Sequence, residues 1–292
     1  MENGHAAVRQ LRYLPPVGAA YGVEVLSFAA LRESDTERRR TRLQRPDFHV
    51  LALITGGSGA HEADFHHHEL REGDVVWIRP GTVHRWSDTE RLDGPLVLFQ
   101  PGFLPDPGLE TRNATAFACR HLPPEALRLA ALAADHLGHE HRAAVRSPRL
   151  ASSALLAHLL AALLLRVLHG TSAPPVPGAT GSPQPEVFHA YRTEVEEHFR
   201  HRHRVADYAR ALGYDARTLT RATRSATGQG AKTFLDQRIL LEAKRLLGHA
   251  GLPAGTCAHR LGFSDAANFT TFFRRLTGLT PTAWTAALHR TP

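Results

Sequence analysis

The chain has 292 residues and a formal net charge of +7, and this length exceeds what one small core needs and indicates two domains. The positive charge is concentrated, because residues 187–292 hold 16 Lys+Arg and 8 Asp+Glu, a net +8, while the rest is close to neutral; a polyanionic partner is therefore expected for that segment alone. Two distant cysteines, Cys119 and Cys257, and an N-terminus without an apolar run exclude a disulfide framework and a secretory signal, so we expect a cytoplasmic protein.

The N-terminal part of the chain has the pattern of a β-domain. Residues 20–103 alternate short β-rich runs with turns, as in YGVEVLSFAAL, FHVLALITGGSG, DVVWIRPGTVHRW and PLVLFQPG. This spacing predicts an antiparallel sandwich or barrel. Two helical stretches follow, at about 123–140 and 148–169. The basic run ERRRTRLQR at 37–45 is expected to be an exposed loop, with a second DNA-binding patch as the alternative.

One motif in this β-domain resembles the second motif of the cupin fold. It lies in LREGDVVWIRPGTVHRW, residues 70–86, where Gly73, Pro80, Gly81 and His84 stand in near-motif positions. The resemblance implies a β-barrel for this domain. Cupins include metalloenzymes, so a metal site has to be considered.

Three consecutive histidines upstream, His66-His67-His68, are followed by Glu72 and imitate the H-x-H-x-x-x-E ligand set of cupin metalloenzymes. The triplet lies five residues before Gly73, in the expected turn that enters the motif, whereas the first cupin motif is expected one or more strands earlier, near 43–59. One or two histidines there do not make a closed metal site. We therefore predict a solvated His-rich turn, no metal and no cofactor, with metal binding as the alternative. The corresponding first-motif positions hold Leu43, Arg45 and His49 or Val50.

Two other histidines fall among apolar strand residues. A mostly apolar barrel with a few placed polar groups suits a small effector, and core histidines satisfied by backbone groups are the competing interpretation. The residues predicted to contact an effector are His49, Leu51, Trp77 and His84.

The stretch LASSALLAHLLAALLLRVLHG, residues 150–170, is strongly apolar. Its uncharged part spans 150–165 with His158 in the middle, which is shorter than the roughly 20 residues of a membrane-spanning helix. We expect no membrane partner; the helix is predicted to pair with the preceding helix and with a second subunit in a homodimer. Residues 171–186 then hold five prolines and two glycines in 16 positions and are predicted to be an exposed linker.

After the linker an internal repeat is visible. ARALGYDARTLTRATRSATG (209–228) matches AHRLGFSDAANFTTFFRRLTG (258–278), with an offset of 49 residues before the turn and 50 after it. Each copy is a helix, a Gly-aromatic turn, an Asp cap and a second helix, which is typical of a helix-turn-helix. Residues 231–249 between the copies are predicted to form one long amphipathic helix that holds the two units in a fixed relation.

The exposed faces of the two second helices differ. In the first copy the residues at i, i+3, i+4 and i+7 are mostly arginine, the side chain best matched to guanine in the major groove. In the second copy Asn268 suits adenine and the alanines suit thymine methyl groups. Unequal readout is therefore expected. The predicted DNA-binding residues are Arg217, Thr220, Arg221 and Arg224, then Ala266, Ala267, Asn268, Thr271, Arg274 and Arg275.

Residues 200–290 resemble the double helix-turn-helix domain of the AraC/XylS family of bacterial transcriptional regulators. The resemblance is carried by VADYARALGYDARTLTR, by RILLEAKRLL and above all by AHRLGFSDAANFTTFFRRLTGLTP. It implies a sequence-specific activator or repressor that acts on double-stranded DNA near promoters, with RNA polymerase as a further partner and no catalysis. It also implies base contacts by residues of both second helices. The chain departs from the family pattern at Thr223, at Thr271 and at the pair Trp284-Thr285.

Together these features predict an α+β multidomain protein. Residues 1–121 form a cupin-like effector-binding barrel, 122–170 a helical dimerisation segment, 171–186 the linker, and 187–292 an all-α domain with two helix-turn-helix units. Two alternatives remain open: a cupin metalloenzyme or metal sensor that carries a DNA-binding domain, and a regulator whose barrel only dimerises.

Overall fold

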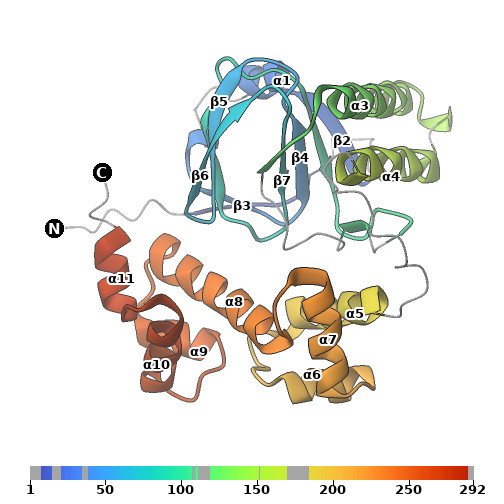
Figure 1. Cartoon of the computed structure of the whole chain (residues 1–292). Coiled ribbons are helices and arrows are strands. Elements are labelled where there is room, and N and C mark those ends of the chain that lie inside the picture. Colours follow the sequence, from blue (N-terminus) through green and yellow to red (C-terminus); the bar gives the residue numbers. More distant parts are fainter. Residues whose placement is uncertain are drawn as a thin grey trace. The chain divides into compact units, whose positions relative to one another are not determined.

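The computed structural model describes residues 8–14, 21–34, 39–106, 109–110, 119–150, 152–169 and 184–288. The described residues divide into two compact units, one within 8–169 and the other within 184–288. The N-terminal unit is β-rich with two long helices, and the C-terminal unit is helical (Figure 1). Each unit is described by itself below.

The strands of the N-terminal unit form two five-stranded sheets in the orders β1-β3-β8-β5-β6 and β10-β7-β4-β9-β2. The sequence predicted a barrel, but the strands stay in two separate sheets and the barrel is not closed. The pairings are antiparallel apart from β1 with β3. The strands are β1 Arg9–Leu11, β2 Val23–Ser27, β3 Gln44–Pro46, β4 His49–Leu53, β5 Ser58–Ala63, β6 His66–Arg71, β7 Asp74–Ile78, β8 His84–Asp88, β9 Pro95–Phe99 and β10 Cys119–His121.

Two local predictions are corrected in this unit. The FAAL segment, expected within a β-rich run, forms helix α1 (Phe28–Glu33), which starts at Ser27 because its hydroxyl accepts a hydrogen bond from the Ala30 amide at 3.1 Å. The histidine triplet is on strand β6 rather than in a turn, since the turn is formed earlier by Asp64 and Phe65, both with positive φ.

The central strands β4 and β7 are buried on both faces, which explains their continuous apolar runs. Alternate residues point to opposite sides. Leu51 and Leu53 belong to a core formed with the long helices, whereas Val50 and Ala52 belong to a core with residues of the other sheet.

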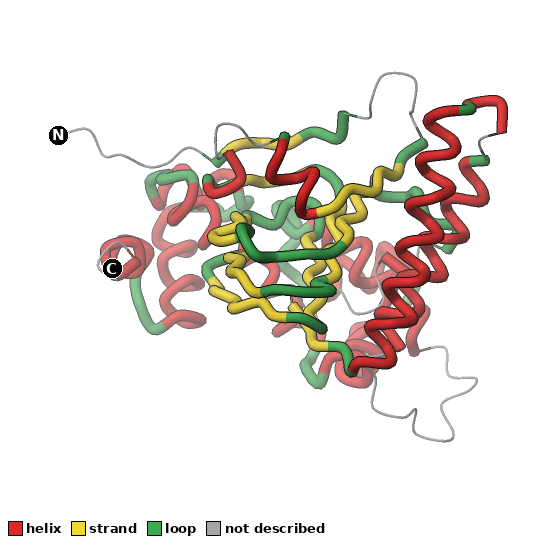
Figure 2. The backbone as a smooth tube through the Cα atoms, turned by 90° about the horizontal axis from the view of Figure 1, so that it is seen from above, coloured by secondary structure: helices red, strands yellow, loops and turns green. Residues whose placement is uncertain are grey.

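Helices α3 (Pro124–Arg146) and α4 (Ser153–His169) lie side by side against the sheet that contains β4 (Figures 1 and 2). The turn η2 (Pro148–Leu150) connects them, and the 3-10 turn η1 (Arg39–Thr41) precedes β3. Leu156, Leu160 and Leu164 of α4 are buried in the shared core. No helix of the described residues has the length and apolar character needed to cross a membrane.

The C-terminal unit packs its helices around one apolar core. Residues 171–183 of the predicted linker lie outside the described residues, whereas Gln184–Glu186 are corrected from linker to the first turn of α5. The predicted single helix at 231–249 is α8 followed by a short π-helical segment, η3. The elements are α5 Gln184–His198, α6 Val205–Leu212, α7 Ala216–Thr227, α8 Ala231–Lys244, η3 Arg245–His249, α9 Ala254–Arg260, α10 Ala266–Thr277 and α11 Pro281–Leu288.

Candidate nucleic-acid interface and effector cavity

Helices α7 and α10 begin and end in the same way, as the internal repeat predicts. The Asp215 carboxylate accepts a hydrogen bond from the Thr218 amide at 2.7 Å, and Asp265 does the same for the Asn268 amide at 2.7 Å. These bonds lower the pKa of both carboxyl groups. Gly228 and Gly278 end the helices in left-handed conformation. The sequence therefore fixes two equivalent helices of 12 residues each.

The inward face of α7 carries Leu219, Ala222 and Thr223, all buried. Thr223 fits there because its hydroxyl donates to the Leu219 carbonyl at 2.7 Å, which leaves its methyl group to pack against the core. Ala226 follows at helical spacing on this face, but it is exposed because the helix ends within two residues.

The outward face of α7 is basic. Arg217, Arg221 and Arg224 are exposed, and half-buried Thr220 donates its hydroxyl to the Ala216 carbonyl at 2.7 Å. In the described part of the chain no carboxylate forms an ion pair with these three arginines. They line a shallow hollow on the surface, together with Ala216, Thr220 and Ser225. The face therefore presents unneutralised positive charge.

The outward face of α10 is less basic. Ala266, Ala267 and Thr271 are exposed, as predicted. Asn268 is exposed too, but its amide nitrogen donates to Ser264 Oγ at 2.7 Å and to Asp265 Oδ2 at 2.9 Å. Pairing with adenine would require the side chain to leave this cap. The Asn268 amide is thus less available for a contact with adenine than the sequence suggests.

The two arginines near the end of α10 have different environments. Arg274 is exposed, whereas Arg275 forms an ion pair with Asp236 of α8, with 3.0 Å between Nη2 and Oδ2. Asp236 is 3% exposed. Arg275 was predicted to contact DNA, but the structure places its guanidinium in an ion pair inside the C-terminal unit.

Buried acidic residues on α8 were not predicted as functional. Asp236 also forms an ion pair with Lys232. Glu242 is 1% exposed, and its Oε1 lies 3.0 Å from Arg200 Nη2 while its Oε2 lies 3.4 Å from Arg245 Nη1. A sign of this in the sequence is that Asp236 follows Leu235 and that Glu242 stands between Leu241 and Ala243.

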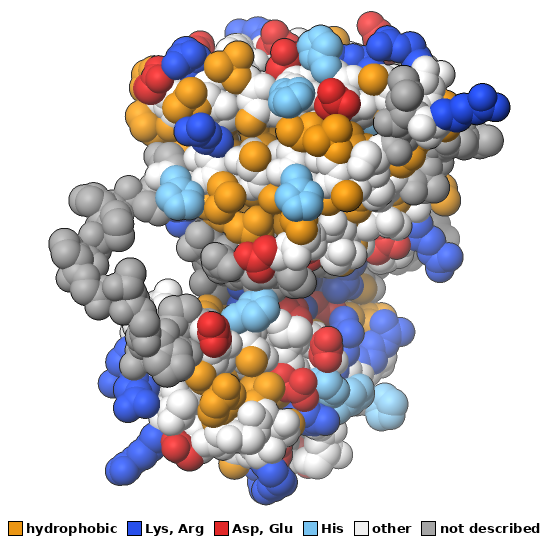
Figure 3. Space-filling view, turned by 90° about the vertical axis from the view of Figure 1, so that its right-hand side faces the viewer, with side chains coloured by type: hydrophobic (Ala, Val, Ile, Leu, Met, Phe, Trp, Pro, Cys, Tyr) orange, Lys and Arg blue, Asp and Glu red, His pale blue; other side chains and the backbone are white. Residues whose placement is uncertain are grey.

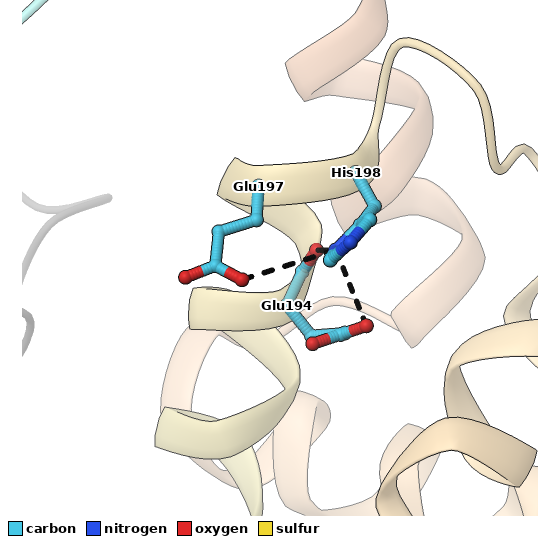
Figure 4. A group of neighbouring side chains, drawn as sticks. All are labelled: Glu194, Glu197 and His198. Atoms are coloured by element: carbon cyan, nitrogen blue, oxygen red, sulfur yellow. Dashed lines mark hydrogen bonds and ion pairs between the residues drawn. The ribbon is translucent and has the colours of Figure 1, made fainter.

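A cluster of Glu194, Glu197 and His198 on α5 brings three groups together that are suited to a metal ion (Figure 4). His198 Nδ1 lies 3.2 Å from Glu194 Oε1, and the same carboxylate oxygen accepts a hydrogen bond from Arg202. One helical turn produces this spacing, and Arg202 neutralises Glu194. The cluster is explained by ion pairing within the unit.

Of the four residues predicted to contact an effector, only His84 lines the cavity described below. Leu51 and Trp77 are fully buried in the core under the long helices. His49 is on the same side, where its Nδ1 accepts a hydrogen bond from Trp77 Nε1 at 3.2 Å and its ring stacks on Phe99 at 4.5 Å. Their grouping as one site is corrected. Because side chains alternate along each strand, period-2 patterning alone does not tell which face encloses a cavity.

His84 does line a cavity, of about 320 Å³, next to apolar residues of both sheets. Two arginines contribute to its wall, and no acidic side chain is among the described residues that form it. Phe48, Trp86 and Leu96 belong to the core on this side of the sheets. The described lining is Arg9, Leu11, Leu26, Leu31, Ser34, Arg40, Gln44, Phe48, Val50, His84, Trp86, Leu96 and Leu98.

His84 is paired with a second buried histidine that the sequence interpretation missed. His84 Nδ1 and His61 Nε2 lie 3.3 Å apart, and neither His84 Nε2 nor His61 Nδ1 has a hydrogen-bond partner among the described residues. Burial lowers the pKa of His84 to about 4 and that of His61 well below its usual value. Both rings are therefore neutral at pH 7, and His84 Nε2 offers an unused polar atom.

The histidine triplet does not form a metal centre in the described residues. His66 and His67 are exposed, and His67 Nε2 pairs with Glu69 at 2.8 Å rather than with Glu72. His68 is half-buried, opposite His61 on β5.

Two domain families match the chain. The model described as an AraC-like ligand binding domain matches residues 26–164, and the one described as a helix-turn-helix domain matches residues 208–287. Among curated proteins, the transcriptional activator RhaS of Escherichia coli O139:H28 (strain E24377A / ETEC) is 23% identical over 241 residues, which cover 78% of this chain and 82% of RhaS.

Solved structures give weaker matches. The DNA-binding domain of AdpA, solved in complex with a target DNA, is 30% identical, covers 37% of this chain and 93% of that domain, and has a TM-score of 0.31. ToxT of Vibrio cholerae O395 is 10% identical, covers 85% of this chain and 92% of ToxT, and has a TM-score of 0.39.

Proposed function

The chain belongs to the AraC/XylS family of transcriptional regulators, and we propose that it binds a bipartite operator as a homodimer under the control of a small effector. The observation that supports this most directly is the basic outward face of α7. Three exposed arginines without ion-pair partners among the described carboxylates suit contacts with guanine and phosphate. We place this DNA binding in the cytoplasm, where DNA and RNA polymerase are found. The similarity to RhaS, a transcriptional activator, supports an activating role.

In the proposed DNA complex, α7 reads bases and α10 contributes fewer base contacts. Recognition helices in successive major-groove segments lie about 34 Å apart on one face of the duplex. Arg217 and Arg221 are close to the N-terminus of α7, the part of a recognition helix that meets base edges. Arg224 and Arg274 are in the last turns and suit phosphate groups.

The test starts with selection of bound duplexes from a random pool by the full chain. Arg217→Ala and Arg221→Ala should each lower discrimination against substituted bases by about 1–3 kcal/mol, the typical worth of a bidentate base contact. Arg274→Ala is the matched control: it should weaken binding to all sequences alike and reduce the salt dependence by about one phosphate contact. Equal losses on selected and scrambled duplexes for the α7 variants would contradict the assignment.

The effector site that we propose is the cavity around His84. Its size is within the usual range of ligand pockets, about 300–1,000 Å³. Its walls are mainly apolar, Arg9 and Arg40 add positive charge, and His84 Nε2 offers a buried polar atom that has no hydrogen-bond partner in the described parts of the chain. These features favour a small molecule with an apolar body and an acidic group.

Matched acid and amide pairs test this ligand class. Thermal shift of the full chain with phenylacetate and hexanoate, against phenylacetamide and hexanamide, should show stabilisation by the acids. Arg9→Gln should remove the preference for the acids, whereas Arg12→Gln, an exposed residue outside the cavity lining, should retain it. A preference for the amides would refute the ligand class, and no shift with either set would refute the cavity as effector site.

The dimer that we propose forms through the outer face of α4. Leu155, His158, Ala162, Leu165 and His169 are exposed and recur at alternating spacings of three and four residues, the pattern of a two-helix coiled-coil seam. Leu155 and Leu165 remain 44% and 40% exposed. Figure 3 shows hydrophobic side chains interspersed with histidines on the face of the N-terminal unit turned to the viewer.

Light scattering after size exclusion tests this seam. The variant Leu155→Lys with Leu165→Lys should be monomeric and should bind paired half-sites more weakly, because the effective concentration of the second subunit is lost. Leu132→Lys on α3 is the control, since this leucine is 56% exposed and lies outside the seam. If the control dissociates the dimer while the α4 variant does not, α3 provides the interface.

A further inference from the structure

The ion pair between Asp236 of α8 and Arg275 of α10 has no counterpart in the first helix-turn-helix unit. In the repeat, Arg274 corresponds to Arg224 at an offset of 50 residues, and Arg275 corresponds to Ser225. Ser225 is exposed. Both helix-turn-helix units thus have an arginine at the position of Arg224 and Arg274. Only the second unit has the additional Arg275, which pairs with Asp236.

Asp236 is an unusual residue for the middle of this helix. It is 3% exposed among the apolar residues Phe234, Leu235 and Ile239 of the same core. Its two cationic partners are Lys232, four residues earlier on the same helix, and Arg275 on α10. Lys232 can compensate the charge but cannot connect elements, so Arg275 provides the link between the helices.

Removing one partner of a buried ion pair is strongly unfavourable, because the remaining charge stays without compensation in a poorly solvated place. Arg275 is therefore held at Asp236, although its own side chain is 56% exposed. Its guanidinium also lies 5.7 Å from the ring of Phe272, on the same helix. The contact fixes α10 against α8 near the C-terminal half of α10.

Other contacts of the second unit act in the same direction. Phe263 lies in the turn between α9 and α10 and packs on His203 of the segment before α6, with ring centroids 4.6 Å apart. Gly262 is so close to Arg200 that an added Cβ would lie 2.3 Å from the Arg200 carbonyl oxygen. The turn between α9 and α10 is thus attached to the segment before α6, and the recognition helix α10 is attached to α8.

We propose that Asp236 is a positioning residue that, through Arg275, sets the spacing at which the second recognition helix meets DNA. This inference depends on the proposed two-groove DNA binding. Asp236 itself makes no contact with DNA. Its effect is on geometry: with the link intact, only operators with one distance between the two groove segments fit both helices.

Charge and geometry predict opposite signs for a variant at this position. Asp236→Asn keeps the size of the side chain and removes one negative charge from a DNA-binding unit. Electrostatics alone would then increase affinity for every duplex. A loss of affinity for the correctly spaced operator cannot arise from that charge change and reports the loss of positioning.

The experiment uses the full chain and duplexes selected by it, with one base pair inserted or deleted between the two groove segments. Affinities are measured for the wild type, Asp236→Asn, Arg275→Gln and the double variant, with Arg274→Gln as control. The wild type should lose on the order of tenfold in affinity on altered spacing, as for a poorly matched site. Asp236→Asn and Arg275→Gln should both bind the operator of original spacing more weakly and lose most of the discrimination between spacings.

Two further comparisons separate positioning from other effects. The double variant should be no worse than either single variant, because both remove one shared interaction, and Arg274→Gln should lower affinity at all spacings equally. If Asp236→Asn unfolds, as judged by circular dichroism, the exposed Arg275→Gln still reports on the link. The proposal fails if Arg275→Gln behaves like Arg274→Gln, or if the wild type accepts all spacings equally. If the wild type selects no duplex at all, DNA binding itself is refuted instead.

Discussion

Gly262 and Gly213 occupy equivalent turns of the two helix-turn-helix units, yet replacement by alanine should have different consequences. Both have left-handed φ angles, +70° for Gly262 and +69° for Gly213, and an alanine in this conformation costs roughly 1–2 kcal/mol. At Gly213 an added Cβ meets nothing within 4 Å, so this strain is the whole effect.

At Gly262 the added Cβ would lie 2.3 Å from the Arg200 carbonyl oxygen and 3.2 Å from His201 Cα. These are backbone atoms, so the turn has to move away from the segment before α6. Overpacking of this kind costs a further ~1–3 kcal/mol. Gly262→Ala should therefore destabilise by about 2–5 kcal/mol, and Gly213→Ala by about 1–2 kcal/mol.

Urea unfolding followed by circular dichroism at the helical band measures the difference, with each transition fitted separately because the chain has two units. A second readout is affinity for the selected duplex, which should fall more for Gly262→Ala because its turn anchors the second unit. Equal destabilisation by the two substitutions would refute the close approach at Gly262, and with it the attachment of the second unit to the Arg200 segment.

Three more outcomes are expected. Asp265→Ala should cost about 1 kcal/mol in thermal unfolding through the lost cap, and it should free the Asn268 amide, so that preference for adenine at one operator position increases; an unchanged preference would contradict this role of the cap. Glu242→Gln should cost roughly 3–5 kcal/mol, because it removes the charge of a carboxylate that is 1% exposed and forms ion pairs with Arg200, Arg238 and Arg245; a loss below 1 kcal/mol would show that these arginines do not depend on the Glu242 charge. Burial lowers the folded-state pKa of His84 from its usual 6.5 to about 4, so the unfolded chain binds more protons between these values, and stability should fall by up to about 3 kcal/mol as pH decreases from 6.5 to 4. His84→Phe should flatten this part of the pH profile, and a profile identical to that of the wild type would exclude His84 as its source.

The organisation of the C-terminal unit was readable from the sequence because its determinants are local. An aspartate cap, a glycine three residues or fewer beyond a helix and an apolar stripe at helical spacing each leave a pattern in consecutive residues. The repeat doubled the information. Residues 208–287 match a helix-turn-helix family, as the repeat predicts.

The cavity could not be read from the sequence, because both faces of the central strands are apolar. In β4, Val50 faces the cavity side while Leu51 faces the helices, and nothing in either residue distinguishes the two. The role of Arg275 was hidden for a related reason. Its partner Asp236 is 39 residues away in the sequence, and long-range ion pairs leave no periodic pattern. The sequence identified an arginine on the exposed side of a helix but not the carboxylate that holds it.

These contacts would give the proposed unequal readout of the two helix-turn-helix units a structural cause. In α7 the arginines at the DNA-facing side have no carboxylate partner among the described residues, so all of their hydrogen-bond donors are available to a duplex. In α10 the corresponding polar groups already make contacts within the protein: the Asn268 amide donates to Ser264 and Asp265 at the helix cap, and Arg275 forms an ion pair with Asp236. A helix that uses its polar groups internally gains a fixed orientation and loses base contacts. In the proposed DNA complex the second helix-turn-helix unit therefore contributes mainly the distance between two groove segments, and base substitutions under α10 should cost less affinity than a change of spacing does.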